Sequence, residues 1–287
     1  MRPVLHFLTA ATLLIGGPFV QGNDEYTFRH ENPVVGEQWA NKVQFDMSMK
    51  MRYRYPGQEI QKTSNKDRQR QLRRLTVLEV QPGYSTKVKV FFERARRQQS
   101  AIDQENQEWL RQPVDGKTYI VRREGDQLVV TNMKGSVPPE EELSIVQHSM
   151  QAVGRPNTLA RFLSGRTIAI GETIRLPGDL ASSFLGSPEG GNAPQEMPMK
   201  LVEVRDIDGV ACGIFAAQME NVKQNSPRTS SHMNGYFAVQ MNTCRVVYVK
   251  FSGPVTFRQT RMIANQEYTV EATGSLAVAM RTSPIPR

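Results

Sequence analysis

The sequence predicts a mainly β (α+β) protein built on a large curved antiparallel sheet, or half-barrel, of about ten strands. Three observations favour this class. Long segments alternate apolar and polar residues with a period of two, turns with Gly and Pro separate them, and one central segment has helical spacing instead. Because the alternating segments keep one polar face, the sheet is expected to be antiparallel with one side toward water.

The clearest strand spans residues 43–55. Its apolar members alternate without a break with polar ones and are Val43, Phe45, Met47, Met49, Met51, Tyr53 and Tyr55. Pro56-Gly57 ends the strand with turn chemistry. We define the Met/Tyr face as Met47, Met49, Met51, Tyr53 and Tyr55. Because methionine adapts to apolar partners of varied shape, this face is either ordinary core or the surface for an apolar ligand.

Two hairpins follow in the N-terminal half. Their arms are residues 72–80 with 85–94, across Pro82-Gly83, and residues 118–123 with 127–131, across Glu124-Gly125-Asp126. The polar stretch between the two hairpins, residues 96–112, has no such alternation. We interpret it as a loop or an irregular excursion.

The middle of the chain changes to helical signals. Three consecutive acids precede apolar residues at helical spacing, where the helix dipole favours negative charge. Asn157 is a suitable N-cap for a second short helix, which Gly165 would end. The two segments form a helical insertion near residues 138–165. A further helical turn is expected at residues 179–185, and a turn-rich surface loop at 186–196.

The C-terminal part returns to strands, at residues 199–206, 210–220, 236–252, 255–261 and 268–280. The first two flank Asp208-Gly209, a strong hairpin signal. Gly253-Pro254 is expected to end the third, because proline cannot donate to a sheet ladder. With no linker-like segment in between, residues 23–287 are predicted to form a single β-rich domain.

Cys212 and Cys244 are the two cysteines. Antiparallel pairing about a loop centred on Arg228 would bring them opposite each other, and would place Phe215 by Met241. We predict a cross-strand disulfide, which the chain-entropy account values at roughly 3–4 kcal/mol. Two free thiols are the alternative. A redox or metal role lacks a CxxC motif.

Residues 1–22 have the form of a secretory signal peptide, with Arg2, a short apolar run and small residues before a cleavage site. That run is too short to span a bilayer, and no later segment is apolar enough. We therefore expect an exported, periplasmic or extracellular protein that is not transmembrane. Such a protein is not expected to bind nucleic acid, and its oligomeric state stays open.

The formal net charge is +8, and the excess lies in the N-terminal half, because residues 23–135 carry 21 Lys and Arg against 15 Asp and Glu. Eight of these cations belong to one predicted hairpin and its extensions: Lys66, Arg68, Arg70, Arg73, Arg74, Arg94, Arg96 and Arg97. Antiparallel pairing would gather them on one cationic sheet edge. That edge would either contact an anionic envelope surface or protect the sheet against aggregation.

No motif points to catalysis, a metal or a cofactor. The chain lacks GxSxG, P-loop, GxGxxG, HExxH and EF-hand patterns. His148 lies off the apolar stripe of its predicted helix, and His232 has two serines beside it but no triad spacing. We expect no cofactor and no metal, and we name no catalytic residue.

Four phrases carry a resemblance: VGEQW, AIGETIRLP, MKLVEVRDIDGVACGIF and CRVVYVKFSGPV. With this layout, most of residues 33–282 resemble an uncharacterised family of exported bacterial (planctomycete-type) β-proteins. That family is similar in outline to the lipoprotein-carrier and LppX-like half-barrels. The resemblance implies a curved sheet with an apolar concave face, and it assigns no functional residue.

The predicted function is therefore that of a non-enzymatic envelope or periplasmic protein whose sheet holds an apolar or lipid-like ligand. One alternative is a structural or interaction protein without a small ligand. A hydrolase of envelope polymers is the other, since carboxylates that folding brings together cannot be read from spacing.

Overall fold

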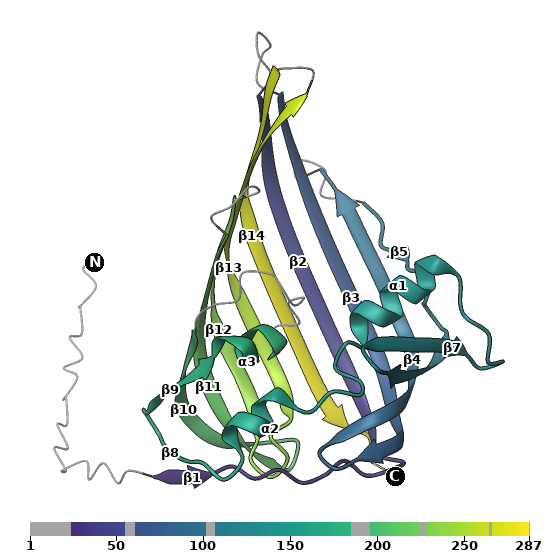
Figure 1. The fold of residues 1–287 in the computed structure, drawn as a ribbon, viewed down its shortest axis with the longest axis vertical. Helices are drawn as coiled ribbons and strands as arrows, with labels where there is room; N and C mark the ends of the chain where they lie inside the picture. Colours follow the sequence, from purple (N-terminus) through teal and green to yellow (C-terminus); the bar gives the residue numbers. More distant parts are fainter. Residues whose placement is uncertain are drawn as a thin grey trace, which may run out of the picture.

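The computed structural model describes residues 24–54, 61–101, 107–184, 196–223, 228–263 and 266–286. In this part of the chain, one twelve-stranded antiparallel sheet dominates, accompanied by a two-stranded sheet and three short helices (Figure 1). The large sheet is not closed into a barrel. The predicted fold class is confirmed.

The two halves of the chain contribute equally to the large sheet. The first half supplies β2 (Gln38–Arg54), β3 (Gln61–Gln81), β4 (Tyr84–Ser100), β5 (Leu110–Arg111), β6 (Thr118–Glu124) and β7 (Gln127–Asn132). The second supplies β9 (Thr173–Pro177), β10 (Glu196–Ile207), β11 (Val210–Lys223), β12 (Arg228–Gln240), β13 (Val246–Ile263) and β14 (Gln266–Pro284). β1 (Glu25–Thr27) and β8 (Thr167–Ala169) form the small sheet.

The first and last long strands lie side by side at the centre. The spatial order is β7-β6-β4-β3-β2-β14-β13-β12-β11-β10-β9, with β5 paired to β4. The β2–β14 ladder runs from Trp39 opposite Pro284 to Arg54 opposite Thr269. This central ladder joins the two halves of the chain, so its geometry decides how the halves are placed.

All three helices lie on one side of the large sheet, which we call its inner face (Figure 1). α1 (Glu140–Ser149) packs on β4, β6 and β7 in a buried cluster that includes Phe92, Tyr119 and Val146. α2 (Thr158–Leu163) and α3 (Gly178–Phe184) cover the opposite end, where Leu163 joins Phe237. Because successive strand residues alternate sides, register assigns every strand residue to the inner or the outer face.

Polar side chains hold α1 at both ends. Glu142, in its first turn, accepts hydrogen bonds from Lys117 Nζ at 2.7 Å and Tyr119 Oη at 2.6 Å. Burial alone would raise the pKa of Glu142, but these hydrogen bonds outweigh it and the pKa lies below its usual range. Arg73 Nη1 donates to the carbonyl of Ser149 at the other end, at 3.2 Å. A cation there complements the helix dipole.

The sequence predicted the turns and helices well. The Asp208-Gly209 turn joins β10 to β11 with positive φ angles of 53° and 81°. Asn157 Oδ1 accepts from the backbone N–H groups of Leu159 and Ala160, so it caps α2 as expected. Both α1 and α2 lie inside the predicted insertion.

Strand lengths differ from the prediction where alternation is missing. β3 begins at Gln61 rather than at residue 72, and β4 continues to Ser100, inside the predicted loop. Both added segments consist of residues with no apolar face, so they gave no period-two signal. The added part of β3 pairs with β2, which does alternate apolar and polar residues, and the added part of β4 pairs in turn with β3. The predicted signal peptide lies outside the described residues. The surface loop predicted at residues 186–196 does so too, except for Glu196, the first residue of β10.

The sequence also merged two strands over residues 236–252. The structure has a turn between Gln240 and Val246, and β13 continues through Gly253 and Pro254. Pro254 has no N–H to donate, and the β12–β13 register has a gap there, between Ser231–Val255 and Asn234–Ser252. The other neighbour, β14, stays in register through the proline and keeps the strand continuous.

The predicted disulfide is wrong. Cys212 lies opposite Gln240, four residues from the predicted partner, and Cys244 follows the end of β12. Both thiols are free and buried. Cys212 Sγ donates to the carbonyl of Val210 in an outer-face cluster, whereas Cys244 Sγ donates to the carbonyl of Arg29 in the inner-face core. The two cysteines therefore lie on opposite sides of the sheet and cannot meet.

Neither cysteine is expected to react in the native protein. Burial raises the pKa of each thiol to about 11, so little thiolate forms near neutral pH. Native protein at pH 7–8 should take up no iodoacetamide, whereas the unfolded, unreduced chain should gain two labels by intact mass. If the unfolded chain gained no label in the absence of reductant, the two cysteines would be disulfide-bonded after all.

Candidate apolar-ligand site

The Met/Tyr face lies at the middle of the inner face. Met47 is opposite Leu276 on β14, and Met51 is opposite Ala272, which is itself opposite Phe257 on β13. Three neighbouring strands thus share one apolar strip. We define the central strip as Phe45, Met47, Met49, Met51, Val255, Phe257, Val270 and Val278. Tyr53 continues its β2 row, and Tyr55 lies outside the described residues.

The side chains of the central strip are partly exposed. None of the eight belongs to the buried cluster under α1 or to the buried cluster under α2 and α3. Leu276, which lies opposite Met47 on β14, does pack against the cluster under α2 and α3. Among the described residues, helices cover the two ends of the inner face and not its middle (Figure 1). Contiguous apolar surface of this kind is rare on a soluble protein unless something binds there.

A polar border follows the central strip on β3. Asn65 lies opposite Met49, and Asp67 lies opposite Met47. Asp67 accepts two hydrogen bonds from Arg97 on β4, from Nε at 3.0 Å and from Nη2 at 2.7 Å. The hydrogen bond to Asp67 raises the pKa of Arg97. The inner face therefore changes from apolar to hydrogen-bonding within one strand spacing.

Three glycines allow the strands of this region to come close together. They are Gly235 on β12, Gly253 on β13 and Gly274 on β14. Each lies two residues away, along its strand, from the residue paired with the preceding glycine, so the three form a diagonal across the sheet. A Cβ atom at these positions would lie 2.0, 1.8 and 1.8 Å from a backbone carbonyl oxygen of the neighbouring strand. Glycine in a strand interior permits sharp curvature. We infer that this diagonal bends the sheet beside the central strip.

One end of the inner face contains a buried cation. Arg73 on β3 is 6% exposed and lies opposite Asn41 on β2. Within the described chain, Arg73 Nε and Asn41 Oδ1 are buried and have no hydrogen-bond partner. Burial lowers the pKa of Arg73 to about 10, which leaves it charged at neutral pH. Arg73 was predicted to contact an anionic surface; its burial and its bond to the end of α1 correct that prediction.

The structure separates the eight predicted basic residues by face. Lys66, Arg68, Arg70, Arg74, Arg94 and Arg96 lie on the outer face, whereas Arg73 and Arg97 lie on the inner face. The sequence did contain this signal, because the two inner residues are odd-numbered and the other six are even-numbered. Pairing brings the two clusters together as predicted, with Arg70 opposite Arg96. They are not at a sheet edge, however, since β3 and β4 both have neighbours on two sides.

The histidines and possible metal ligands among the described residues form no metal-binding cluster. No three His, Cys, Asp or Glu side chains among them are placed to hold a metal ion. His232 Nδ1 lies 2.9 Å from Glu220 Oε1, but this pair is exposed on the outer face, and His148 is exposed as well. No described helix has the length and apolar character needed to cross a membrane.

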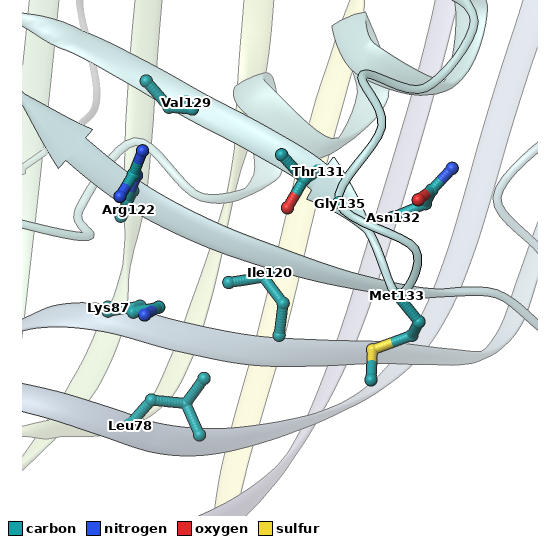
Figure 2. Close-up of a pocket in the computed structure, with 9 residues that line it drawn as sticks. All are labelled: Leu78, Lys87, Ile120, Arg122, Val129, Thr131, Asn132, Met133 and Gly135. Atoms are coloured by element: carbon teal, nitrogen blue, oxygen red, sulfur yellow. The ribbon is translucent and has the colours of Figure 1, made fainter.

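A hollow lies on the outer face, over β3, β4, β6 and β7 (Figure 2). Its volume is about 440 Å³, and Leu78, Ile120 and Met133 contribute to its lining. Its two cations, Lys87 and Arg122, are opposite each other in register, and each has a carboxylate partner at 2.7 Å. None of the predicted site residues lines this hollow.

No family model matches the chain, and neither does any curated protein. Among solved structures it is similar to lipovitellin, in a structure titled for lipid–protein interactions, with a TM-score of 0.40 and 7% identity over 88% of this chain. The chain spans about a quarter (26%) of that lipovitellin chain. It is also similar to a LolA superfamily protein from Nitrosomonas europaea, with a TM-score of 0.13 and 7% identity, covering 85% of this chain and 87% of the other. Likenesses this distant carry no argument about ligands, which must come from the residues themselves.

Proposed function

We propose that the protein is an exported, non-enzymatic envelope or periplasmic protein that holds an apolar or lipid-like ligand along the central strip. The observation that carries this proposal is the row of partly exposed apolar side chains across β2, β14 and β13, to which the helix-covered clusters do not extend. The signal-like N-terminus supports the export part.

The dimensions and chemistry of the strip suit an acyl chain. From Phe45 to Tyr53 the β2 row extends for about 27 Å at the usual strand rise, and three strands span about 10 Å. Apolar contact is worth roughly 25 cal/mol for each Å² removed from water. The methionines adapt to a flexible ligand, while Asn65 and the Asp67–Arg97 pair offer hydrogen bonds to a polar end.

Met49→Glu is expected to weaken binding of an environment-sensitive fluorescent fatty acid by about 10- to 100-fold. The substitution removes apolar contact worth about 1.5–3 kcal/mol for a fully buried methionine and puts a carboxylate against the ligand. The matched control is Ser48→Glu, which adds the same charge on the adjacent outer-face position. It should bind the probe as the parent protein does.

Native mass spectrometry and solvent extraction of the purified full chain complete the test, by identifying any lipid that copurifies. Probe binding that Met49→Glu leaves unchanged, in a variant whose unfolding midpoint matches the parent, would reject the central strip as the site. A parent protein that binds neither probe nor lipid would favour the structural or interaction role.

A further inference from the structure

The outer face of β2, β3 and β4 is strongly basic. Register places nineteen positions on it: the alternate residues from Lys42 to Arg54, those from Lys62 to Arg74, and their β4 partners Phe91, Arg94, Arg96, Gln98 and Ser100. Eleven of these are Lys or Arg, four on β2, five on β3 and two on β4, and Asp46 is the one acid among the nineteen. We call these eleven cations the basic face.

The basic face does not contribute to the stability of the sheet. Arg52 lies opposite Lys62, and Arg70 lies opposite Arg96. Like charges directly opposite on neighbouring strands are destabilising, so these pairs cost stability. Protection of a sheet edge does not explain them, because β2 and β3 are internal strands. On the same outer face, the next strand, β14, carries Glu271 opposite Arg52, followed by the neutral residues Thr273 and Ser275.

Carboxylates neutralise only part of the basic face. Ion pairs connect four of the eleven cations with carboxylates: Arg68 with Asp46 at 3.4 Å, Arg54 with Glu271 at 3.5 Å, Arg74 with Glu93 at 2.6 Å and Arg96 with Asp115 at 3.1 Å. In contrast, Lys42, Lys50 and Lys66 have no carboxylate oxygen within 4.0 Å among the residues that the structure describes. Lys42 and Lys50 are also exposed. Unneutralised, accessible cations in a row attract an extended anion.

We propose that the basic face docks on the surface of an anionic lipid bilayer. A bilayer offers a two-dimensional array of negative headgroups, which a sheet face can meet without a groove. Single-stranded nucleic acid is bound through a row of stacking aromatics in a groove. Here Phe91 lies opposite Arg74 at one end, and the ring of Trp109 is already stacked on the guanidinium of Arg70, 4.7 Å from its centroid. Each Lys or Arg close to an anionic leaflet contributes about 1 kcal/mol, within a Debye length of about 10 Å.

The test is co-sedimentation of the full chain with phosphatidylcholine vesicles, with or without about one third phosphatidylglycerol. The parent protein should bind the anionic vesicles at about 0.1 M salt and dissociate from them at about 0.5 M salt. It should not bind the neutral vesicles. The triple variant Lys42→Gln, Lys50→Gln, Lys66→Gln should partition about 100-fold more weakly, because three charges at about 1 kcal/mol each correspond to roughly two decades.

The matched control removes three exposed lysines elsewhere, as Lys134→Gln, Lys200→Gln, Lys250→Gln. It has the same net charge as the test variant and should partition within about threefold of the parent protein. An equal loss in both variants would show that net charge and not this face governs binding, and would overturn the proposal. So would a parent protein that binds dextran sulfate but not anionic vesicles.

This proposal stands apart from the ligand site. Both triple variants should bind the fluorescent fatty acid as the parent does, because the substituted lysines lie on the outer face or in loops. Vesicle binding without probe binding would reject the ligand proposal alone. Probe binding without vesicle binding would reject this one alone.

Discussion

Gly274→Ala is expected to destabilise the protein by about 2–4 kcal/mol, with a drop in Tm of about 5–15 °C. A Cβ atom at this position would lie 1.8 Å from the Ser48 carbonyl oxygen and 2.6 Å from Met49 Sδ. The methionine can move away, but the carbonyl belongs to the β2–β14 ladder. The two strands must therefore separate at the place where the two halves of the sheet join.

Chemical denaturation of the full chain measures the effect, and Thr273→Ala is its control. Thr273 is the adjacent residue, exposed on the outer face, and its replacement by the same residue should cost less than about 1 kcal/mol. Equal stability of the two variants would mean that β2 and β14 are not packed so closely. The glycine diagonal would then lose its role in shaping the inner face.

Local signals in the sequence predicted the elements because each signal acts over a few residues. Asn157 caps α2, and Asp208-Gly209 forms its turn, whatever the rest of the chain does. Alternation on β2 likewise predicted a strand with one apolar face. The polar first half of β3 carries no such signal, because its strand conformation comes from pairing with β2 and β4.

Long-range register could not be obtained in the same way. The predicted disulfide depended on the assumed centre of one loop, and an error of four residues in pairing moved Cys212 from Cys244 to Gln240. A shift in register also changes which residues share a face. The pairing of β2 with β14, which creates the central strip, joins segments from opposite ends of the chain and leaves no trace in local pattern.

The candidate site was therefore predicted only in part. The Met/Tyr row was recognised on β2, and alternation was recognised over residues 268–280. That the two rows adjoin on one face, with Phe257 beyond them, required the structure. Arg97 is a residue whose type alone was misleading. As an arginine it was predicted to contact an anionic surface, but register places it on the inner face, where it binds Asp67.

Phe237→Ala is expected to cost about 3–5 kcal/mol, the usual range for a buried phenylalanine. Phe237 is fully buried on the inner face of β12. Its ring stacks with Phe215 at 5.4 Å and with Phe251 at 6.4 Å between centroids. Truncation would leave a cavity in the cluster under α2 and remove both stacking contacts. Denaturant unfolding of the full chain gives the change in free energy.

Tyr236→Ala is the matched control, because it removes an aromatic side chain from the neighbouring position on the outer face. Tyr236 is 53% exposed, so its loss should cost about 1 kcal/mol or less. Phe237 does not belong to the central strip, and folded Phe237→Ala should therefore still bind the fluorescent fatty acid. A stability loss no larger than that of Tyr236→Ala would contradict the packing of α2 on this end of the sheet. Lost probe binding in the folded variant would instead extend the ligand site beneath α2.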